Sequence, residues 1–112
     1  MLFRSYGSAL RILEWSIAAY DKLGLVRNRT GNRLEHSAPL DNYPSRDGRY
    51  VCIVAAAQNN FERLCAAMDR PDLLTNERYA TPQARAENNE AVNRVVADWA
   101  AELTAEIGRA HV

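Results

Sequence analysis

The sequence predicts an α+β fold in which amphipathic helices pack against a β-hairpin. A two-residue turn signal, Asp47-Gly48, precedes the apolar run Tyr50–Val54, and a short apolar run bounded by a turn is typical of a strand buried on both faces. Apolar residues then recur at helical spacing over residues 61–68, which predicts one buried helix face. A longer apolar stripe follows Thr81-Pro82. We therefore expect the hairpin to lead into helices that cover it.

Length and charge limit the class of protein. The chain has 112 residues, which is the length of one domain. Lys and Arg together number 14, as do Asp and Glu, so the formal charge is zero. A nucleic-acid surface needs excess positive charge, and a membrane span needs a run of about 20 apolar residues. The sequence has neither feature, so we expect a cytoplasmic protein that binds neither nucleic acid nor membrane.

The cysteines and histidines give little support to a metal site. Cys52 and Cys65 are both predicted to lie on core faces as buried free thiols, and they do not form a CxxC pair. His36 has no Cys or second His at the spacing of metal ligands. We accordingly predict no metal site and no permanently bound cofactor.

The two ends of the chain share an unusual feature. Codons for residues 1–5 and for the start of residues 107–112 can be written as reverse complements of one another, in strings that look like a short-read sequencing adapter. We interpret both ends as adapter-derived and exclude them from the fold prediction. We therefore expect a fragment of a longer protein, with a helix and linker over residues 6–36 and a truncated small α+β domain over residues 37–106.

The first helix is predicted over Ser8–Leu23, with Gly24 as the residue that ends it. Its apolar residues form two stripes, Leu10, Leu13, Ile17 and Tyr20 on one side and Ile12, Trp15 and Ala19 on the other. A helix that is apolar on two sides needs partners on both. We expect it to pack on sequence outside this chain or on another subunit, and the alternative is an ordinary core helix with one exposed Trp.

The segment Leu25–Ser37 is polar and basic, which predicts an irregular connection. Arg27, Arg29 and Arg33 could contact a phosphate-bearing ligand, because guanidinium groups pair with phosphate through two hydrogen bonds, and Arg29 and Arg33 are the candidates we choose. His36 lies in the same segment and is the third candidate substrate-binding residue. The alternative is a solvated linker in which His36 is an ordinary surface residue.

The small domain is predicted element by element. Pro39 and Pro44 flank the first arm of the hairpin, which indicates an edge strand or an irregular one. Asn59 is expected to cap the helix that follows the hairpin, with Glu62 completing a capping box. Residues 69–81 are expected to form a connection that places a few apolar side chains on the core.

The last helix is predicted to begin at Thr81-Pro82 and to run to about Leu103. Its apolar stripe consists of Val92, Val95, Val96, Trp99 and Leu103. Arg85 and several other charged residues lie off that stripe, so we expect them on a solvated face.

No catalytic residue can be named from motifs. The sequence has no Gly-rich phosphate loop after a strand, no nucleophile elbow and no Ser/His or Cys/His pair. A series of spaced residues nevertheless resembles the class III CoA-transferases, also called the CaiB/BaiF family. These residues are Gly31-Asn32, Ala38-Pro39, Tyr43, Asp47-Gly48, Tyr50-Val51, Ile53, Phe61, Leu64, Pro71–Leu73, Thr81, Arg85, and Asn88 or Asn89.

The resemblance implies a function for a longer parent protein. Such enzymes move coenzyme A from an acyl-CoA thioester to a carboxylic acid, and an aspartate nucleophile forms anhydride and thioester intermediates. They form interlocked homodimers with a large nucleotide-fold domain and a smaller α+β domain. This chain resembles the linker and the small domain only, so the nucleophilic aspartate is expected upstream and the fragment is expected to be inactive alone.

Two alternatives remain open from the sequence. The chain could be a stand-alone small binding or dimerisation module without catalysis, or the parent could be a 2-methylacyl-CoA racemase, since the family has relatives of that kind. We predict that the isolated chain is marginally stable or associates through Ile12, Trp15 and Ile17.

Overall fold

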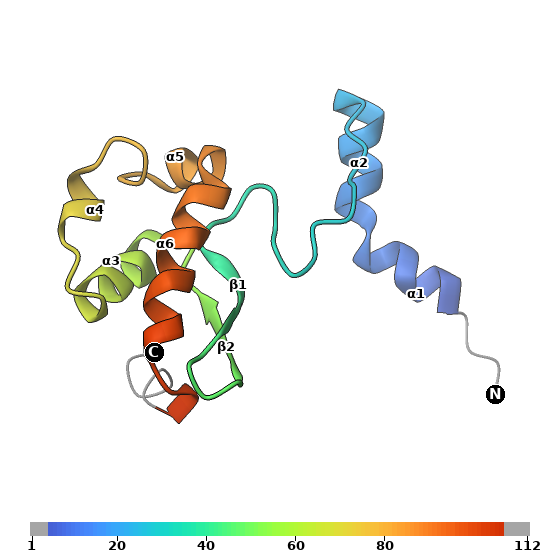
Figure 1. The fold of residues 1–112 in the computed structure, drawn as a ribbon. Helices are drawn as coiled ribbons and strands as arrows, with labels where there is room; N and C mark the ends of the chain where they lie inside the picture. The colour runs from blue at the N-terminus through green and yellow to red at the C-terminus, as the bar shows by residue number, and fades with distance from the viewer. Residues whose placement is uncertain (1–4, 107–112) are drawn as a thin grey trace.

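The computed structural model describes residues 5–106, and the proposed adapter-derived ends lie almost entirely outside this range. Its helices and strands follow one another along the chain as shown in Figure 1. They are α1 (Ser5–Ile12), α2 (Glu14–Leu23), β1 (Leu40–Pro44), β2 (Tyr50–Val54), α3 (Gln58–Ala67), α4 (Asp72–Thr75), α5 (Pro82–Glu87) and α6 (Asn89–Glu102).

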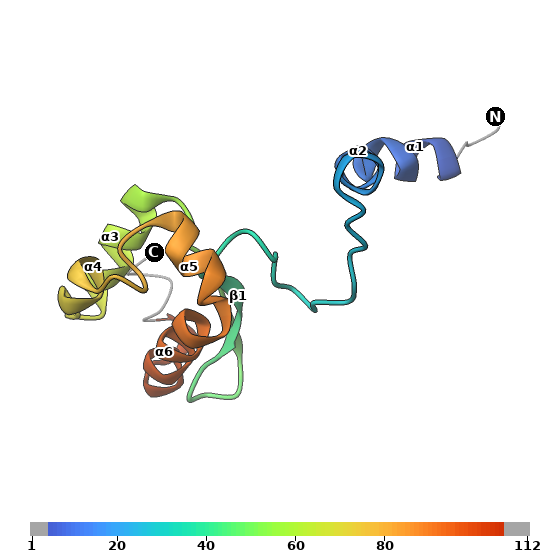
Figure 2. The ribbon, with the colours of Figure 1, turned by 90° about the horizontal axis from the view of Figure 1, so that it is seen from above.

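The chain is elongated because its two N-terminal helices stand away from the rest. Figures 1 and 2 both show α1 and α2 on one side, and a linker that joins them to a compact unit formed by the later elements. The radius of gyration is 16.8 Å, whereas a compact chain of this length has about 13 Å. The compact unit, residues 38–106, is called the small domain below.

The β-hairpin is formed as predicted, but its second face is open. β1 and β2 pair antiparallel from Leu40 opposite Val54 to Pro44 opposite Tyr50. Residues 45–49 connect them, so the predicted two-residue turn is wrong in length, although Gly48 lies in the connection with φ +75°. Burial alternates along β2, so the predicted burial on both faces is wrong. Cys52 lies on the open face and is exposed, so its predicted burial is wrong too. A two-stranded sheet covered by helices on one side leaves its other side free.

The core lies between the inner face of the hairpin and the helices. Tyr43, Val51 and Ile53 supply the hairpin side, and α6 contributes Val92 and Val96. The predicted apolar face of α3 is confirmed, because Phe61, Leu64, Cys65 and Met68 are all buried. Leu73 and Tyr79 add to the core from the connection after α3, as expected.

The ends of the helices differ in part from the prediction. The capping box at Asn59 is wrong, because α3 begins at Gln58 after Ala57 and has no side-chain cap. The start at Thr81-Pro82 is confirmed, since the Thr81 hydroxyl accepts a hydrogen bond from the Ala84 amide at 3.1 Å. The expected single long helix is divided into α5 and α6 at Asn88.

Arg85 was expected on a solvated face, and this expectation is wrong. The side chain has no exposed surface, and its guanidinium lies 4.1 Å from the centre of the Phe61 ring. It donates hydrogen bonds to the carbonyl oxygens of Ala38 (3.2 Å), Ala56 (2.9 Å) and Tyr79 (2.9 Å). These carbonyls belong to irregular segments, where no ladder or helix supplies donors to them. Arg85 therefore joins the two ends of the hairpin to the segment before α5.

The N-terminal helical segment is broken at Leu13 instead of continuous. Gly24 ends α2 in the left-handed conformation with φ +66°, as predicted. Both apolar stripes are largely exposed in this chain, including Ile12, Trp15 and Ile17. Residues 5–106 therefore cover neither side of the segment, and its packing on other sequence or on another subunit stays a prediction.

Candidate functional site

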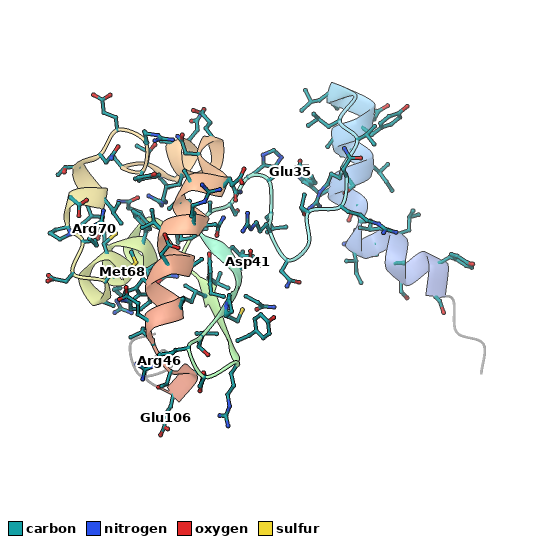
Figure 3. The ribbon with its side chains drawn as sticks, viewed as in Figure 1. Glu35, Asp41, Arg46, Met68, Arg70 and Glu106 are labelled. Carbon is teal, nitrogen blue, oxygen red and sulfur yellow. The ribbon has the colours of Figure 1, made fainter. Side chains whose placement is uncertain are left out.

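The candidate site is the linker loop, residues 25–37, which connects α2 to the small domain. Figure 3 shows Glu35 on this loop, between the two halves of the chain, and Asp41 at the beginning of β1. The loop is irregular as predicted, with an isolated bridge between Leu34 and Ser37. The Thr30 hydroxyl donates to the Arg33 carbonyl at 2.7 Å and tightens the turn.

The two candidate arginines have different environments. Arg33 is half-buried, and its Nε donates to Asp41 Oδ2 at 2.6 Å in an ion pair. Arg29 is exposed and makes no ion pair within residues 5–106. The charge of Arg33 is thus largely neutralised by Asp41, whereas the charge of Arg29 is available to a ligand.

His36 lies against Trp15 of α2 rather than beside the arginine candidates. The two rings meet edge to face with centroids 5.7 Å apart, and the Arg27 guanidinium lies 5.5 Å from the centre of the Trp15 ring. A cavity of about 360 Å³ is lined here by Trp15, Arg27 and residues 34–37. The structure therefore brings His36 to an aromatic and cationic cavity, and places Arg33 at a different contact.

A second cavity lies where the linker loop meets α6. Its volume is about 280 Å³, and Thr30, Arg33, Leu34, Glu35, Asn89 and Glu90 line it. Asn89 Nδ2 donates to the Leu34 carbonyl at 2.9 Å across this junction. The linker loop therefore has a cavity on each side, one toward α2 and one toward the small domain.

Asn89 is connected to the core through a series of hydrogen bonds, which we call the asparagine relay. Asn93 Nδ2 donates to Asn89 Oδ1 at 2.6 Å, and Asn93 Oδ1 accepts from the Tyr43 hydroxyl. Tyr43 and Asn93 are fully buried. Burial, with a smaller effect from Asp41, raises the pKa of Tyr43 above its ordinary value, so that the phenol stays protonated.

The carboxylate of Asp47 and the thiol of Cys65 both have contacts that serve the fold. A hydrogen bond from Ser45 lowers the pKa of Asp47, whose carboxylate also accepts from the Ala105 amide. Burial raises the pKa of Cys65 to about 11, which disfavours the reactive thiolate. Within residues 5–106, no group of three or more His, Cys, Asp or Glu side chains could hold a metal ion.

Sequence reasoning did not assign roles to Asn89, Asn93 or Arg85. Asparagine in a helix and arginine off an apolar stripe usually face solvent, so the burial of Asn93 and Arg85 was not predicted. A signal was present nonetheless, because Tyr43, Arg85 and Asn88 or Asn89 are among the residues that carry the family resemblance.

Comparison with known proteins identifies the family to which this fold and loop belong. The sequence profile of CoA-transferase family III matches residues 3–108. The chain therefore belongs to CoA-transferase family III.

Between residues 5 and 106, every helix falls short of the length and apolarity that a membrane span requires.

Individual relatives agree with this assignment. The succinyl-CoA–D-citramalate CoA-transferase of Chloroflexus aurantiacus is 40% identical over 101 residues, which are 90% of this chain and 25% of that protein. The succinyl-CoA:mesaconate CoA-transferase of Haloarcula hispanica is 35% identical over 101 residues, again 90% of this chain and 25% of that protein. The chain thus spans about a quarter of the length of the relatives it matches.

A solved structure confirms the fold. A CaiB/BaiF family protein from Brucella suis superposes with a TM-score of 0.72 at 24% identity, covering 89% of this chain and 26% of that one. The predicted α+β fold of the small domain is therefore confirmed. The likeness at this identity concerns the fold alone.

Proposed function

We propose that this chain is the linker and small domain of a longer CoA-transferase, which moves coenzyme A from an acyl-CoA thioester to a carboxylic acid. The observation that carries the proposal is the family match over residues 3–108. The relatives named above are all transferases, which favours transfer over the racemase alternative. It also favours an enzyme segment over a stand-alone binding module.

We infer that the acyl donor is succinyl-CoA and that the acceptor is a short dicarboxylic acid. The relatives named above act with succinyl-CoA, and citramalate and mesaconate are dicarboxylic acids. Cationic groups suit the phosphates of coenzyme A and the carboxylates of both substrates. Arg27 and Arg29 are the exposed cations of the linker loop that form no ion pair within residues 5–106. Arg27 lies over the Trp15 ring, so we assign the main contact to Arg29.

We assign Arg33 and His36 supporting parts in the same binding region. Arg33 keeps its ion pair with Asp41 and fixes the course of the loop. His36 borders the cavity beside Trp15, whose lining also includes Arg27 and Glu35, and an aromatic part of a ligand fits against the Trp15 and His36 rings there. Coenzyme A enters as a substrate, and the proposal includes no permanently bound cofactor.

The nucleophile is proposed to lie upstream of this chain. Three aspartates of the small domain already have structural partners, because Asp41 pairs with Arg33, Asp47 accepts from Ala105, and Asp72 pairs with Arg70 at 2.9 Å. A carboxylate nucleophile must be free to attack the thioester carbon. These contacts, together with the family resemblance, support the proposal that the isolated chain is inactive, and detectable CoA transfer by the chain alone would contradict this point.

The parent is proposed to be a cytoplasmic homodimer in which the exposed stripes of α1 and α2 are covered. Trp15, Ile17 and Tyr20 would leave water there, and each fully buried side chain of this size contributes roughly 1.5–3 kcal/mol. This supports an interlocked assembly, since one helix segment needs partners on both of its sides.

A segment exchange tests the proposed function. The 101 matching residues of the Chloroflexus aurantiacus D-citramalate enzyme are replaced by the corresponding residues of this chain. We expect the chimera to transfer CoA from succinyl-CoA to D-citramalate, and a variant that lacks the segment to be inactive. A chimera that assembles like the Chloroflexus enzyme but transfers no CoA would contradict the proposal.

The substrate contact is tested by charge reversal in that chimera. R29E combined with R33E is expected to raise the KM for succinyl-CoA, and R29E alone is expected to account for most of the change. R46E is the matched control, because Arg46 is an exposed arginine in the hairpin turn, away from the linker loop. An unchanged affinity in the double variant would remove the linker arginines from the binding site.

A further inference from the structure

The linker loop is attached to the small domain through specific polar contacts. Asn89 Nδ2 donates to the Leu34 carbonyl, and Arg33 pairs with Asp41. Leu34 lines both cavities of the candidate site. A change in the position of its backbone therefore alters both cavities together.

The orientation of the asparagine relay is determined by this attachment. The Leu34 carbonyl can only accept a hydrogen bond, so the Asn89 amide must turn its NH₂ group toward the loop. Asn89 Oδ1 then faces inward and accepts from Asn93 Nδ2 at 2.6 Å, and the side-chain oxygen of Asn93, Oδ1, accepts from the Tyr43 hydroxyl. Every donor in the series thus points outward, from the core to the loop.

The inner end of the relay cannot adjust easily. Tyr43 has 1% of its surface exposed and Asn93 has none, and both are held in the packed core between β1 and α6. Asn93 Nδ2 also donates to the backbone carbonyl of Asn89 at 2.9 Å, and this bond holds the first turn of α6. A rigid core therefore fixes the side chain of Asn89, and Asn89 fixes the loop.

We propose that Asn89 is a positioning residue, which holds the linker loop in the place where the enzyme binds its acyl-CoA substrate. The catalytic consequence rests on the proposed function, whereas the anchoring of the loop does not. Asn89 itself does not contact the reacting atoms in this proposal. It acts through Leu34, whose carbonyl it binds between the two cavities.

The test uses Asn89→Asp, which keeps the size of the side chain and its acceptor for Asn93. It replaces the donor to Leu34 with a carboxylate oxygen, so the anchor is lost and repulsion is added. Asn89 is the first residue of α6, where a negative charge is favourable to the helix, so the fold is expected to survive. Asn89→Ser, which is too short to reach Leu34 and adds no charge, is the second variant.

The first readout is amide hydrogen exchange in the full 112-residue chain. The amides of Arg33 and Ser37 bond within the loop at 3.4 Å, and N89D is expected to speed their exchange about two- to tenfold, the range for one lost hydrogen bond. The Ala55 amide, which bonds to the Pro39 carbonyl, should be unaffected. E90Q is the matched control, because Glu90 lines the same cavity without bonding to Leu34.

The second readout is the kinetics of the active chimera. N89D is expected to raise the KM for succinyl-CoA about two- to tenfold with kcat unchanged, because a binding loop that contacts the ground state and the transition state equally affects KM alone. Unchanged exchange in the loop would overturn the anchoring, whether or not the chimera is active. Faster exchange with an unchanged KM would overturn the positioning role. An inactive chimera before any substitution would count against the proposed function, and the exchange result would still decide the anchoring.

Discussion

Replacing Arg85 with methionine tests whether one buried cation holds the small domain together. The guanidinium is fully buried and donates to the carbonyls of Ala38, Ala56 and Tyr79. Methionine fills a similar elongated volume but offers no donor. The substitution therefore separates the hydrogen bonds of Arg85 from its packing against Phe61.

The expected loss follows from the carbonyls that remain without a donor. Each buried carbonyl without a partner costs about 1–3 kcal/mol. We take the lower end, because Gln58, the fourth hydrogen-bond partner of Arg85, is only half-buried and water can enter beside it. Burial of the guanidinium is unfavourable to its charge and lowers the pKa of Arg85 in the folded chain. Methionine carries no charge, so this desolvation cost disappears and offsets part of the loss. We expect R85M to reduce the free energy of unfolding by about 3 kcal/mol, which is a large share of the roughly 4–10 kcal/mol expected for a domain of this size.

The assay is a urea titration of the 112-residue chain followed by far-UV circular dichroism at pH 7. The control is R94M, because Arg94 is exposed on α6 and forms a surface ion pair with Glu90 at 3.4 Å. We expect the control to change the free energy of unfolding by less than about 0.5 kcal/mol. If the free energy of unfolding of R85M lies within about 1 kcal/mol of that of the unsubstituted chain, with the same dependence on urea concentration, the assignment of Arg85 as the central polar contact is refuted.

Other predictions follow from the titratable groups and the apolar stripes. A hydrogen bond from Ser45 lowers the folded-state pKa of Asp47. The carboxylate therefore contributes to the free energy of unfolding above the ordinary carboxyl pKa, and this contribution is lost as pH falls through the lowered value. The free energy of unfolding of D47N should approach that of the unsubstituted chain as the pH is lowered, and a difference that is constant with pH would contradict this. A thiol reagent should label exposed Cys52 in the folded chain and reach Cys65, whose pKa is raised to about 11 by burial, only after unfolding; equal labelling rates would show that Cys65 is accessible. I17K should increase the monomer fraction in sedimentation, and an unsubstituted chain that is already monomeric would refute association through this stripe.

Local patterns were sufficient for several elements of the fold. The place of the hairpin turn around Gly48, the end of α2 at Gly24 and the start of α5 at Thr81 were predicted correctly, because each depends on the backbone preferences of one or two residues. The buried face of α3 was also predicted, since helical spacing alone determines which residues share a side. The candidate loop was located by its composition, but the separate environments of Arg33 and His36 were not predicted.

The errors concern residues whose environment depends on distant segments. The capping box at Asn59 failed because α3 begins at Gln58, so Asn59 lies inside the first turn instead of at the cap position. The outer face of β2 was expected to be buried, but burial requires a covering layer, and residues 5–106 place none over this face. The role of Asn89 depends on Leu34, which is 55 residues away in the sequence.

The sequence by itself determined the α+β class, the hairpin turn, the apolar helix faces and the likeness to CoA-transferase family III, because these follow from short-range spacing and from the order of spaced residues. Only the tertiary structure decided that Arg85 is buried beneath the hairpin ends and that Tyr43, Asn93 and Asn89 connect the core to the linker loop. The physical reason is that a polar side chain enters a core only where backbone groups from distant segments leave donors or acceptors to be satisfied, and that requirement arises when those segments meet.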